Sequence, residues 1–275
     1  MRISVFLEHL LEAEKQSGLP LSSVLRAVRG FGISGAEVDY ERLAENPQLP
    51  WLLRENGLEI SCVYAFFDFA HRDESKRAHT VLKTLEGCGA RLLMAIPGFF
   101  SPEDERKATL ERMIGGMERL IESAEAVGIE VCLEDFDDHS APFSTIGGLN
   151  GFLERLPRLG CAFDTGNFCY SEESEAEAFR LLRDRIVHVH CKDRRFSPNR
   201  PNEEEKRTLG GRKMYPAAVG TGALPIGTMV KTLLRTGYRG WFVIEHFGSA
   251  DQLSDVEKSA ENLRSWNDDH RNRME

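Results

Sequence analysis

The sequence has no run of about 18 apolar residues, so we expect no membrane-spanning helix. The apolar run at the N-terminus is short and is interrupted by Glu8, so no signal peptide is expected. The six cysteines contain no Cys-x-x-Cys pair, and three of them lie inside apolar runs, as is typical of reduced core cysteines. A net charge of −9 argues against a nucleic-acid binder. These absences indicate a cytoplasmic protein that binds neither membranes nor nucleic acids.

No linker rich in Pro, Gly or Ser divides the 275 residues. Short apolar runs alternate with longer segments of helical periodicity, at the spacing of βα units. Eight strands are expected, at Ile3–Phe6, Gly35–Val38, Ile60–Tyr64, Arg91–Ile96, Glu130–Glu134, Cys161–Asp164, Ile186–His190 and Trp241–Glu245. The pattern predicts an α/β fold, a single (β/α)8 TIM barrel over residues 1–275, with the active site at the C-terminal ends of the strands.

The clearest helical pattern covers Ser101–Val127. Ser101 is a good N-cap residue, and Pro102 suits the first helical position. Gly128 is a plausible stop, because glycine readily adopts the left-handed conformation just after a helix. The last helix is expected at Gln252–Trp266.

Four of the expected strands end in a side chain that can bind a metal ion. These residues are Glu134, Asp164, His190 and Glu245, separated by 30, 26 and 55 positions. Because the C-terminal ends of parallel barrel strands meet at one mouth, we expect the four side chains to converge. Each alone has an ordinary explanation, such as a solvated strand end, but their recurrence at four strand ends favours a common site.

Three carboxylates and one imidazole suit Mn²⁺, Mg²⁺ or Co²⁺ better than a structural thiolate zinc site. Without an ion the three acids would raise one another's pKa, which is a reason to expect one. Such an ion can polarise a substrate carbonyl, and a carboxylate on each side can move protons. Strand alternation places His188 and Lys192 on the same face as His190, although His188 alone is more typical of a buried core histidine.

More than thirty residues separate His190 from the helix expected near Pro225, which is far more than the few residues of an ordinary βα loop. This segment, 191–224, is rich in Lys and Arg. It is either a lid over the barrel mouth or a disordered surface excursion. The lid interpretation is favoured for its ends, and it makes Arg195 a candidate for binding an anionic group of the substrate.

In combination these motifs resemble those of the xylose isomerase-like barrels, in particular the sugar phosphate isomerase/epimerase branch, over nearly the whole chain. The strongest matches are Cys132-Leu133-Glu134-Asp135, Phe163-Asp164-Thr165-Gly166-Asn167, Val187–Asp193 and Val243-Ile244-Glu245. Weaker matches are Gly35-Ala36-Glu37-Val38 and Gly220-Thr221-Gly222. The chain departs from the usual pattern at Thr221, where relatives commonly carry Glu, and in its long 191–224 segment. The motifs are specific for the superfamily rather than for one reaction.

The resemblance implies one bound divalent ion, manganese first and magnesium, cobalt or zinc as alternatives. The implied ligands are Glu134, Asp164, His190 and Glu245. The implied catalytic residues are Glu134 and Glu245 as an acid/base pair, with Lys192 contacting a substrate oxygen. Further contacts around the substrate are implied for His188, Asn167 and Glu37.

The favoured function is an isomerase or epimerase of a sugar or keto-polyol, which transfers a proton between two glutamates through a metal-stabilised enediolate. The alternative is a metal-dependent dehydratase, a lyase of the inosose or dehydroshikimate type. A non-catalytic sugar-binding barrel is less favoured, because the ligand set is complete. An apurinic endonuclease would need more strand-end histidines, whereas five of the eight lie elsewhere, at His9, His71, His79, His139 and His270. The expected partner is a small sugar, polyol or keto acid, and a homo-oligomer stays open.

Overall fold

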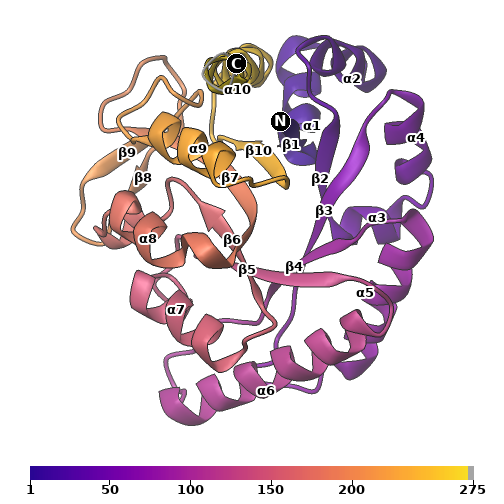
Figure 1. Cartoon of the computed structure of the whole chain (residues 1–275), viewed down its shortest axis with the longest axis vertical. Helices are drawn as coiled ribbons and strands as arrows, with labels where there is room; N and C mark the ends of the chain where they lie inside the picture. Colours follow the sequence, from indigo (N-terminus) through magenta and orange to yellow (C-terminus); the bar gives the residue numbers. More distant parts are fainter. Residues whose placement is uncertain (272–275) are drawn as a thin grey trace.

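The computed structural model describes residues 1–271 and contains a closed barrel of eight parallel strands (Figure 1). The barrel strands are β1 (Arg2–Phe6), β2 (Gly35–Asp39), β3 (Glu59–Phe66), β4 (Leu92–Ile96), β5 (Glu130–Glu134), β6 (Gly160–Asp164), β7 (Ile186–Arg195) and β10 (Trp241–Glu245). Each strand pairs with the next, and β10 closes the ring by pairing with both β1 and β7. The expected TIM barrel is confirmed.

Helices surround the barrel on its outer side (Figure 1). They are α1 (Leu7–Ser17), α2 (Leu21–Gly30), α3 (Tyr40–Glu45), α4 (Leu49–Glu55), α5 (Ser75–Cys88), α6 (Arg106–Glu125), α7 (Ile146–Arg155), α8 (Glu175–Leu182), α9 (Ile226–Arg235) and α10 (Gln252–Arg271), with short 3₁₀ turns η1 (Phe168–Ser171) and η2 (Arg183–Arg185). Helix α9 is typical: it buries Ile226, Met229, Val230, Leu233 and Leu234, which recur at helical spacing on one face. Among residues 1–271, no helix has the length and apolarity needed to cross a membrane.

Helix α6 begins later than expected, at Arg106 rather than near Ser101. The side chain of Glu105 is the N-cap, because it accepts hydrogen bonds from the amides of Lys107 and Ala108 at 3.2 and 2.7 Å. Ser101 instead donates its own amide to Asp104 at 2.6 Å. The prediction of Ser101 as the cap was therefore wrong, since the acidic residues that follow it form a turn of their own.

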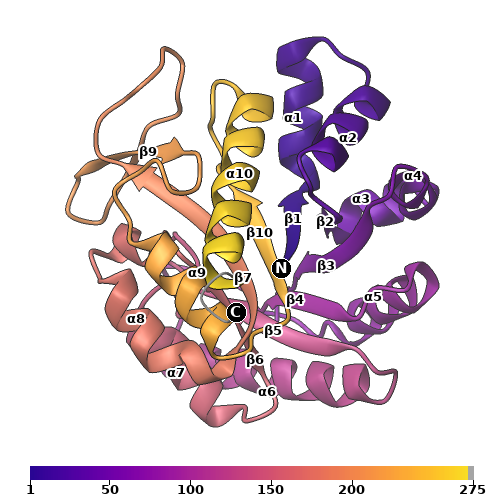
Figure 2. The same ribbon diagram turned by 45° about the horizontal axis from the view of Figure 1, so that its top comes forward.

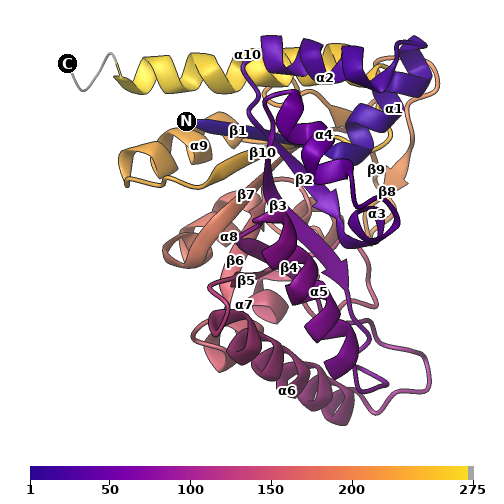
Figure 3. The same cartoon turned by 90° about the vertical axis from the view of Figure 1, so that its right-hand side faces the viewer.

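Strand β7 continues five residues beyond the expected end at His190. Outside the barrel, its residues 193–195 pair in antiparallel fashion with β9 (Lys213–Ala217), which in turn pairs with β8 (Lys206–Arg207). Figure 2 shows β7 extending past the barrel toward β9, and Figure 3 shows β8 and β9 at the end of the barrel where the strand arrowheads lie. The 191–224 segment is thus built on a three-stranded extension at the barrel mouth.

This extension, which we call the β7–β9 extension (residues 193–217), contacts three parts of the barrel. The ammonium of Lys206 lies 2.7 Å from Asp137, which follows β5. The amide of Glu204 donates to the carbonyl of Gly248, which follows β10, at 3.0 Å. Arg200 lies 2.9 Å from Asp255 on α10. These contacts hold the extension across the mouth.

Candidate functional site

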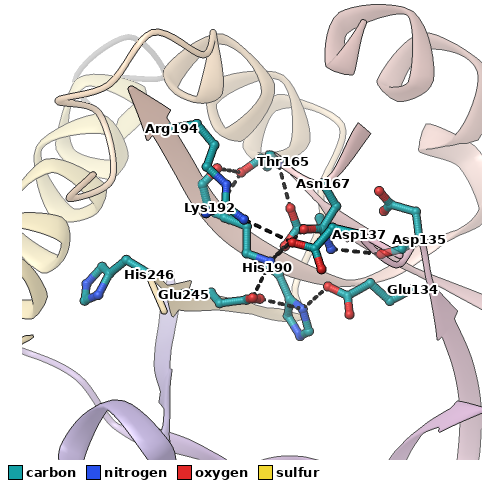
Figure 4. Close-up of polar contacts among 12 residues, drawn as sticks. Glu134, Asp135, Asp137, Thr165, Asn167, His190, Lys192, Arg194, Glu245 and His246 are labelled. Atoms are coloured by element: carbon teal, nitrogen blue, oxygen red, sulfur yellow. Dashed lines mark hydrogen bonds and ion pairs between the residues drawn. The ribbon is translucent and has the colours of Figure 1, made fainter. Parts of the chain in front are cut away.

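The four predicted ligand side chains meet at the C-terminal ends of β5, β6, β7 and β10. Figure 4 labels Glu134, His190 and Glu245 among them. One ligand atom from each of Glu134, Asp164, His190 and Glu245 lies within 4.8 Å of every other. All four side chains are almost completely buried. Residues up to 111 positions apart in sequence, from Glu134 to Glu245, therefore form one compact cluster, as the strand-end spacing predicted.

The imidazole of His190 is the centre of this cluster. Its Nδ1 lies 2.5 Å from Glu134 Oε1 and 3.2 Å from Glu245 Oε2. Its Nε2 faces the other way, toward the two oxygens of Glu37, each at 3.2 Å. Burial alone would lower the pKa of His190, but the surrounding carboxylates, Glu134 first, outweigh burial and raise this pKa well above its ordinary value.

Glu37 lies beneath the cluster, wholly buried on β2. Its Oε2 is also 2.7 Å from Nε2 of His188, so one carboxylate contacts both histidines of β7. Burial alone would raise the pKa of Glu37, but the charges on His190 and His188 outweigh burial and lower the pKa to about 2. A register shift between Ala36 and Glu37 interrupts the pairing of β2 with β3 at this position, and such irregularities re-aim side chains.

The carboxylates of the cluster differ in their protonation behaviour. Burial, reinforced by the neighbouring acids, raises the pKa of Asp164 well above its ordinary value. Burial also raises the pKa of Glu134, against the opposing effect of His190. For Glu245 the ammonium of Lys192 and the imidazole of His190 outweigh burial and hold the pKa below its usual range. The expected mutual repulsion thus contributes at Asp164 and Glu134 but is overcome at Glu245 by a buried cation.

That cation, Lys192, is 4% exposed and points into the cluster. Its ammonium forms a close ion pair with Glu245, donates to Asn167 Oδ1 at 2.7 Å and lies 3.5 Å from Asp164 Oδ2. Burial would lower the pKa of Lys192, but Asp164 and Glu245 outweigh burial and raise it, so the side chain stays protonated.

Two residues of the cluster, Glu134 and Glu245, lie at the floor of a cavity of about 320 Å³. Of the residues predicted to act in catalysis or to contact the substrate, Glu134, Asn167, Lys192 and Glu245 line this cavity. Glu37 and His188 are wholly buried and lie beneath the floor. Arg195 points elsewhere: it pairs with Glu203 and donates to the carbonyl of Pro216. The structure therefore does not bring Arg195 to the cavity.

Five charged residues that were not predicted as site residues line the same cavity. They are Asp39, Asp137, Arg194, Glu204 and Lys206. Asp137 Oδ2 lies 3.2 Å from Arg194 Nη2 and 2.7 Å from Lys206 Nζ. The alternation that placed His190 and Lys192 on the inner face of β7 would also have placed Arg194 there, if the predicted strand had been four residues longer. Lys206 carries no comparable signal, because its position depends on the fold of the β7–β9 extension.

The donor set fits a divalent ion. Three carboxylates and an imidazole nitrogen within coordination reach of one another are ligands that Mn²⁺ and Mg²⁺ accept. In addition, two buried oxygens, Asp164 Oδ2 and Glu245 Oε2, lack a hydrogen bond of good geometry within residues 1–271, although Lys192 lies 3.5 Å from the first and His190 Nδ1 lies 3.2 Å from the second. Buried carboxylate oxygens with such incomplete partners leave room for an ion as a further ligand partner.

The chain belongs to the family of xylose isomerase-like TIM barrels, whose sequence model matches residues 25–266. It is 27% identical over 250 residues to the rhizopine catabolism protein MocC of Rhizobium meliloti, a match that covers 82% of this chain and 74% of that protein. It is also 27% identical over 154 residues to the inosose dehydratase of Lacticaseibacillus casei, covering 54% of this chain and about half, 49%, of that enzyme. The solved structure of an L-ribulose 3-epimerase superposes with a TM-score of 0.74 at 16% identity, covering 99% of this chain and 96% of the other. The predicted family is confirmed; this chain is similar in sequence to a dehydratase and in fold to an epimerase.

Proposed function

We propose that this protein is a divalent-metal-dependent isomerase or epimerase of a keto-polyol. The observation that carries the proposal is the convergence of Glu134, Asp164, His190 and Glu245 on one buried cluster beside the ammonium of Lys192. Two residues of the cluster lie at the floor of a cavity that can hold a small molecule. The arrangement combines a cation site, two glutamates and a fixed positive charge in one place.

Glu134, Asp164, His190 and Glu245 would hold the ion, with manganese favoured and magnesium, cobalt or zinc as alternatives. When bound, the ion supplies Lewis-acid polarisation of a substrate carbonyl. His190 would offer Nδ1 to the ion, because its Nε2 faces Glu37. A carboxylate that accepts the second N–H of a ligating histidine fixes its ring and tautomer, so Glu37 acts through His190 rather than on the substrate.

Glu134 and Glu245 would form the acid/base pair. They come from β5 and β10, which are not adjacent in the barrel, and both line the cavity. The pKa of Glu134 is raised and that of Glu245 is lowered, so Glu245 is the carboxyl held in the ionised form that can accept a proton. Glu245 would take the proton next to the substrate carbonyl, and Glu134 would return a proton.

Lys192 would stabilise the negative charge that develops on the substrate oxygen during proton removal. Its raised pKa keeps it as an ammonium, so it is a hydrogen-bond donor and not a base. Asn167, which accepts from Lys192 and donates to the carbonyl of Asp135 at 2.9 Å, would hold the ammonium in place. The ammonium of Lys192 is thereby oriented by Asn167, Glu245 and Asp164 before the substrate binds.

The charges around the cavity favour an uncharged substrate. Most basic residues of the β7–β9 extension have acidic partners: Arg195 pairs with Glu203, Arg200 with Asp255, Arg207 and Lys213 with Glu205, and Lys206 with Asp137. Arg194, which also lines the cavity, contacts Asp137 as well, and Arg212 stacks on the ring of Phe196. An anionic substrate would have to displace such an acidic partner. Hydroxyl groups can donate hydrogen bonds to the carboxylates and accept them from the ammonium groups without breaking these ion pairs. A neutral keto-polyol is therefore favoured over a keto acid.

We also propose that the β7–β9 extension is a lid. It places Glu204 and Lys206 on the cavity wall and contacts the segments after β5 and β10. A covering of this kind keeps water from a reactive carbanion-like intermediate. The fold of the extension is thus part of the site rather than a surface addition.

A dehydratase acting on an inosose-like polyol is the second candidate. It is favoured by the similarity to the inosose dehydratase of Lacticaseibacillus casei, although that match spans only about half of the enzyme. Both reactions begin with the same proton removal. They differ in whether a proton returns or a β-hydroxyl leaves as water.

The test is turnover of ketoses and inososes by manganese-loaded protein, with product analysis by mass spectrometry. An isomerase or epimerase gives a product of unchanged mass, and a dehydratase gives one lighter by a water molecule. Glu134→Gln and Glu245→Gln should each lower turnover about 10²–10⁴-fold, the usual contribution of general acid–base catalysis. Glu130→Gln, at the opposite end of β5, is the matched control and should keep full activity. Near-normal turnover in both site variants would refute the acid/base assignment.

A further inference from the structure

The cavity above the ion ligands has an aromatic wall. Five rings line it, which we call the aromatic arc: Phe6, Tyr64, Phe66, Phe136 and Phe247. Neighbouring rings contact one another in series, with centroids 6.0 Å apart for Phe136 and Phe66, 6.3 Å for Phe66 and Tyr64, 5.7 Å for Tyr64 and Phe6, and 5.6 Å for Phe6 and Phe247. The arc follows the ends of β5, β3, β1 and β10.

The opposite wall of the cavity is polar and charged. It is formed by Asp137, Asn167, Lys192, Arg194, Glu204 and Lys206, from the ends of β5, β6 and β7 and from the β7–β9 extension. On the aromatic side, Met94 and Ile96 of β4 add apolar surface, and Asp39 at the end of β2 is a charged residue. A ligand in this cavity therefore meets hydrogen-bonding groups on one side and aromatic rings on the other. That division suits a ring whose hydroxyls point to one wall and whose C–H face packs on the other.

The aromatic arc changes from buried to exposed as it leaves the ligand cluster. Phe6 is 4% exposed and lies edge-on to His190 with centroids 4.9 Å apart, and Tyr64 is 9% exposed. Phe66 and Phe247, in contrast, are 40% and 45% exposed. Within residues 1–271, they are two of six large hydrophobic side chains with this degree of exposure. Exposed aromatic rings that line a cavity are typical of a binding site.

We propose that the outer part of the cavity, at Phe66 and Phe247, binds an aromatic substituent carried by the polyol substrate. This inference rests on the proposed function, because the inner part must hold the polyol ring near the ion ligands. A bare polyol can pack its C–H face on Phe6 and Tyr64 but has no apolar surface left for the two outer rings. The substrate class is thus an aryl-substituted cyclic polyol or sugar rather than an unsubstituted one.

Contact with a second copy of this chain explains the exposure of Phe66 and Phe247 less well than a bound ligand does. Phe66 and Phe247 line one cavity, so a protein surface seated on both would close the route by which a substrate reaches Glu134 and Glu245. An aryl substituent can pack on one of these rings while the rest of the same molecule occupies the floor, because Tyr64 and Phe6 separate the two rings along the arc. The continuity of the arc, from exposed rings to the ring beside His190, favours the single ligand.

The test compares phenyl and methyl β-D-glucopyranoside as probes, with binding to manganese-loaded protein measured by calorimetry. We expect the phenyl glycoside to bind about tenfold more tightly, because each aromatic contact contributes about two- to tenfold. Phe66→Ser and Phe247→Ser should each reduce this preference while leaving manganese stoichiometry unchanged. Leu181→Ser, which alters an exposed apolar side chain on α8, is the control and should leave the preference as it is.

Several results would overturn the inference. One is equal binding of the two probes, or no binding of the phenyl glycoside up to its solubility limit. Another is a phenyl preference that survives in both serine variants. A third is a change of oligomeric mass in these variants with no change of preference, which would make the rings a subunit interface. Absence of manganese binding in wild-type protein would instead refute the proposed function; the two probes are therefore also compared on metal-free protein, where a phenyl preference tests the outer rings alone.

Discussion

Replacing Glu37 with Gln tests whether a residue beneath the floor controls the ion site. The carboxylate contacts His188 Nε2 at 2.7 Å and His190 Nε2 at 3.2 Å, and Gln keeps its shape but can offer only one acceptor oxygen. The amide nitrogen must then face one of the two histidines, so one contact is lost and the His190 ring is less firmly held. Removing such a partner of a ligating histidine costs about 10–100-fold in metal affinity, or about 1.4–2.8 kcal/mol.

The assay is calorimetric titration of the metal-stripped protein with Mn²⁺, run beside thermal unfolding. Unfolding stability should also fall, by about 1–3 kcal/mol, because a buried donor loses its acceptor. Glu45→Gln, at an exposed position on α3, is the matched control and should change neither quantity. If Glu37→Gln binds manganese as tightly as wild type while remaining folded, then Glu37 does not position His190.

Three further predictions follow from the geometry of the site. Gly166→Ala should destabilise the fold by about 1–3 kcal/mol and weaken ion binding, because the new Cβ would lie 2.6 Å from the carbonyl oxygen of Lys192. Chemical denaturation measures the change in stability. The control Gly151→Ala, which has open space around it in α7, should be neutral or stabilising. Asp193→Ala should lower the free energy of unfolding by about 1–3 kcal/mol, since its carboxylate accepts hydrogen bonds from four backbone amides at 2.8–3.3 Å, and an unchanged denaturation midpoint would contradict this. Manganese affinity should increase from mildly acidic to neutral pH, because the ion must displace a proton from Asp164, whose pKa is raised by burial and by neighbouring acids; a pH-independent affinity in calorimetry would be inconsistent with this reasoning.

The ends of the barrel strands could be predicted because they depend on local sequence. Each of Glu134, Asp164 and Glu245 closes a short apolar run, and β5 and β10 have the bounds that were expected. The parity of β7 likewise placed His190 and Lys192 on one face. Once the βα rhythm implied a closed barrel, the geometry of the fold required these ends to converge.

The polar wall of the cavity could not be predicted, because it depends on pairing between distant segments. Strand β7 runs on to Arg195 because residues 193–195 find partners in β9, about twenty positions away. That extension brings Arg194 into the cavity and turns Arg195 toward Glu203. Basic residues of this segment pair with carboxylates from other parts of the chain, as Arg194 and Lys206 do with Asp137.

The position of Glu37 beneath the cluster could not be predicted from the sequence either. Its motif indicated a residue near the substrate, but the register shift on β2 and the two histidines of β7 hold it beneath the cluster. Contacts of this kind link residues more than 150 positions apart. Only the folded barrel shows which carboxylates face the cavity and which support the ligands from below.

Metal content tests the central claim most directly. Wild-type protein and His190→Ala, dialysed against Mn²⁺ and then against metal-free buffer, would be compared by inductively coupled plasma mass spectrometry, with His139→Ala, an exposed histidine, as the control. The account predicts about one divalent ion per chain in wild type and in the control, and its loss in His190→Ala. Wild-type protein that retains no ion, or a His190→Ala variant that retains as much as wild type, would contradict it.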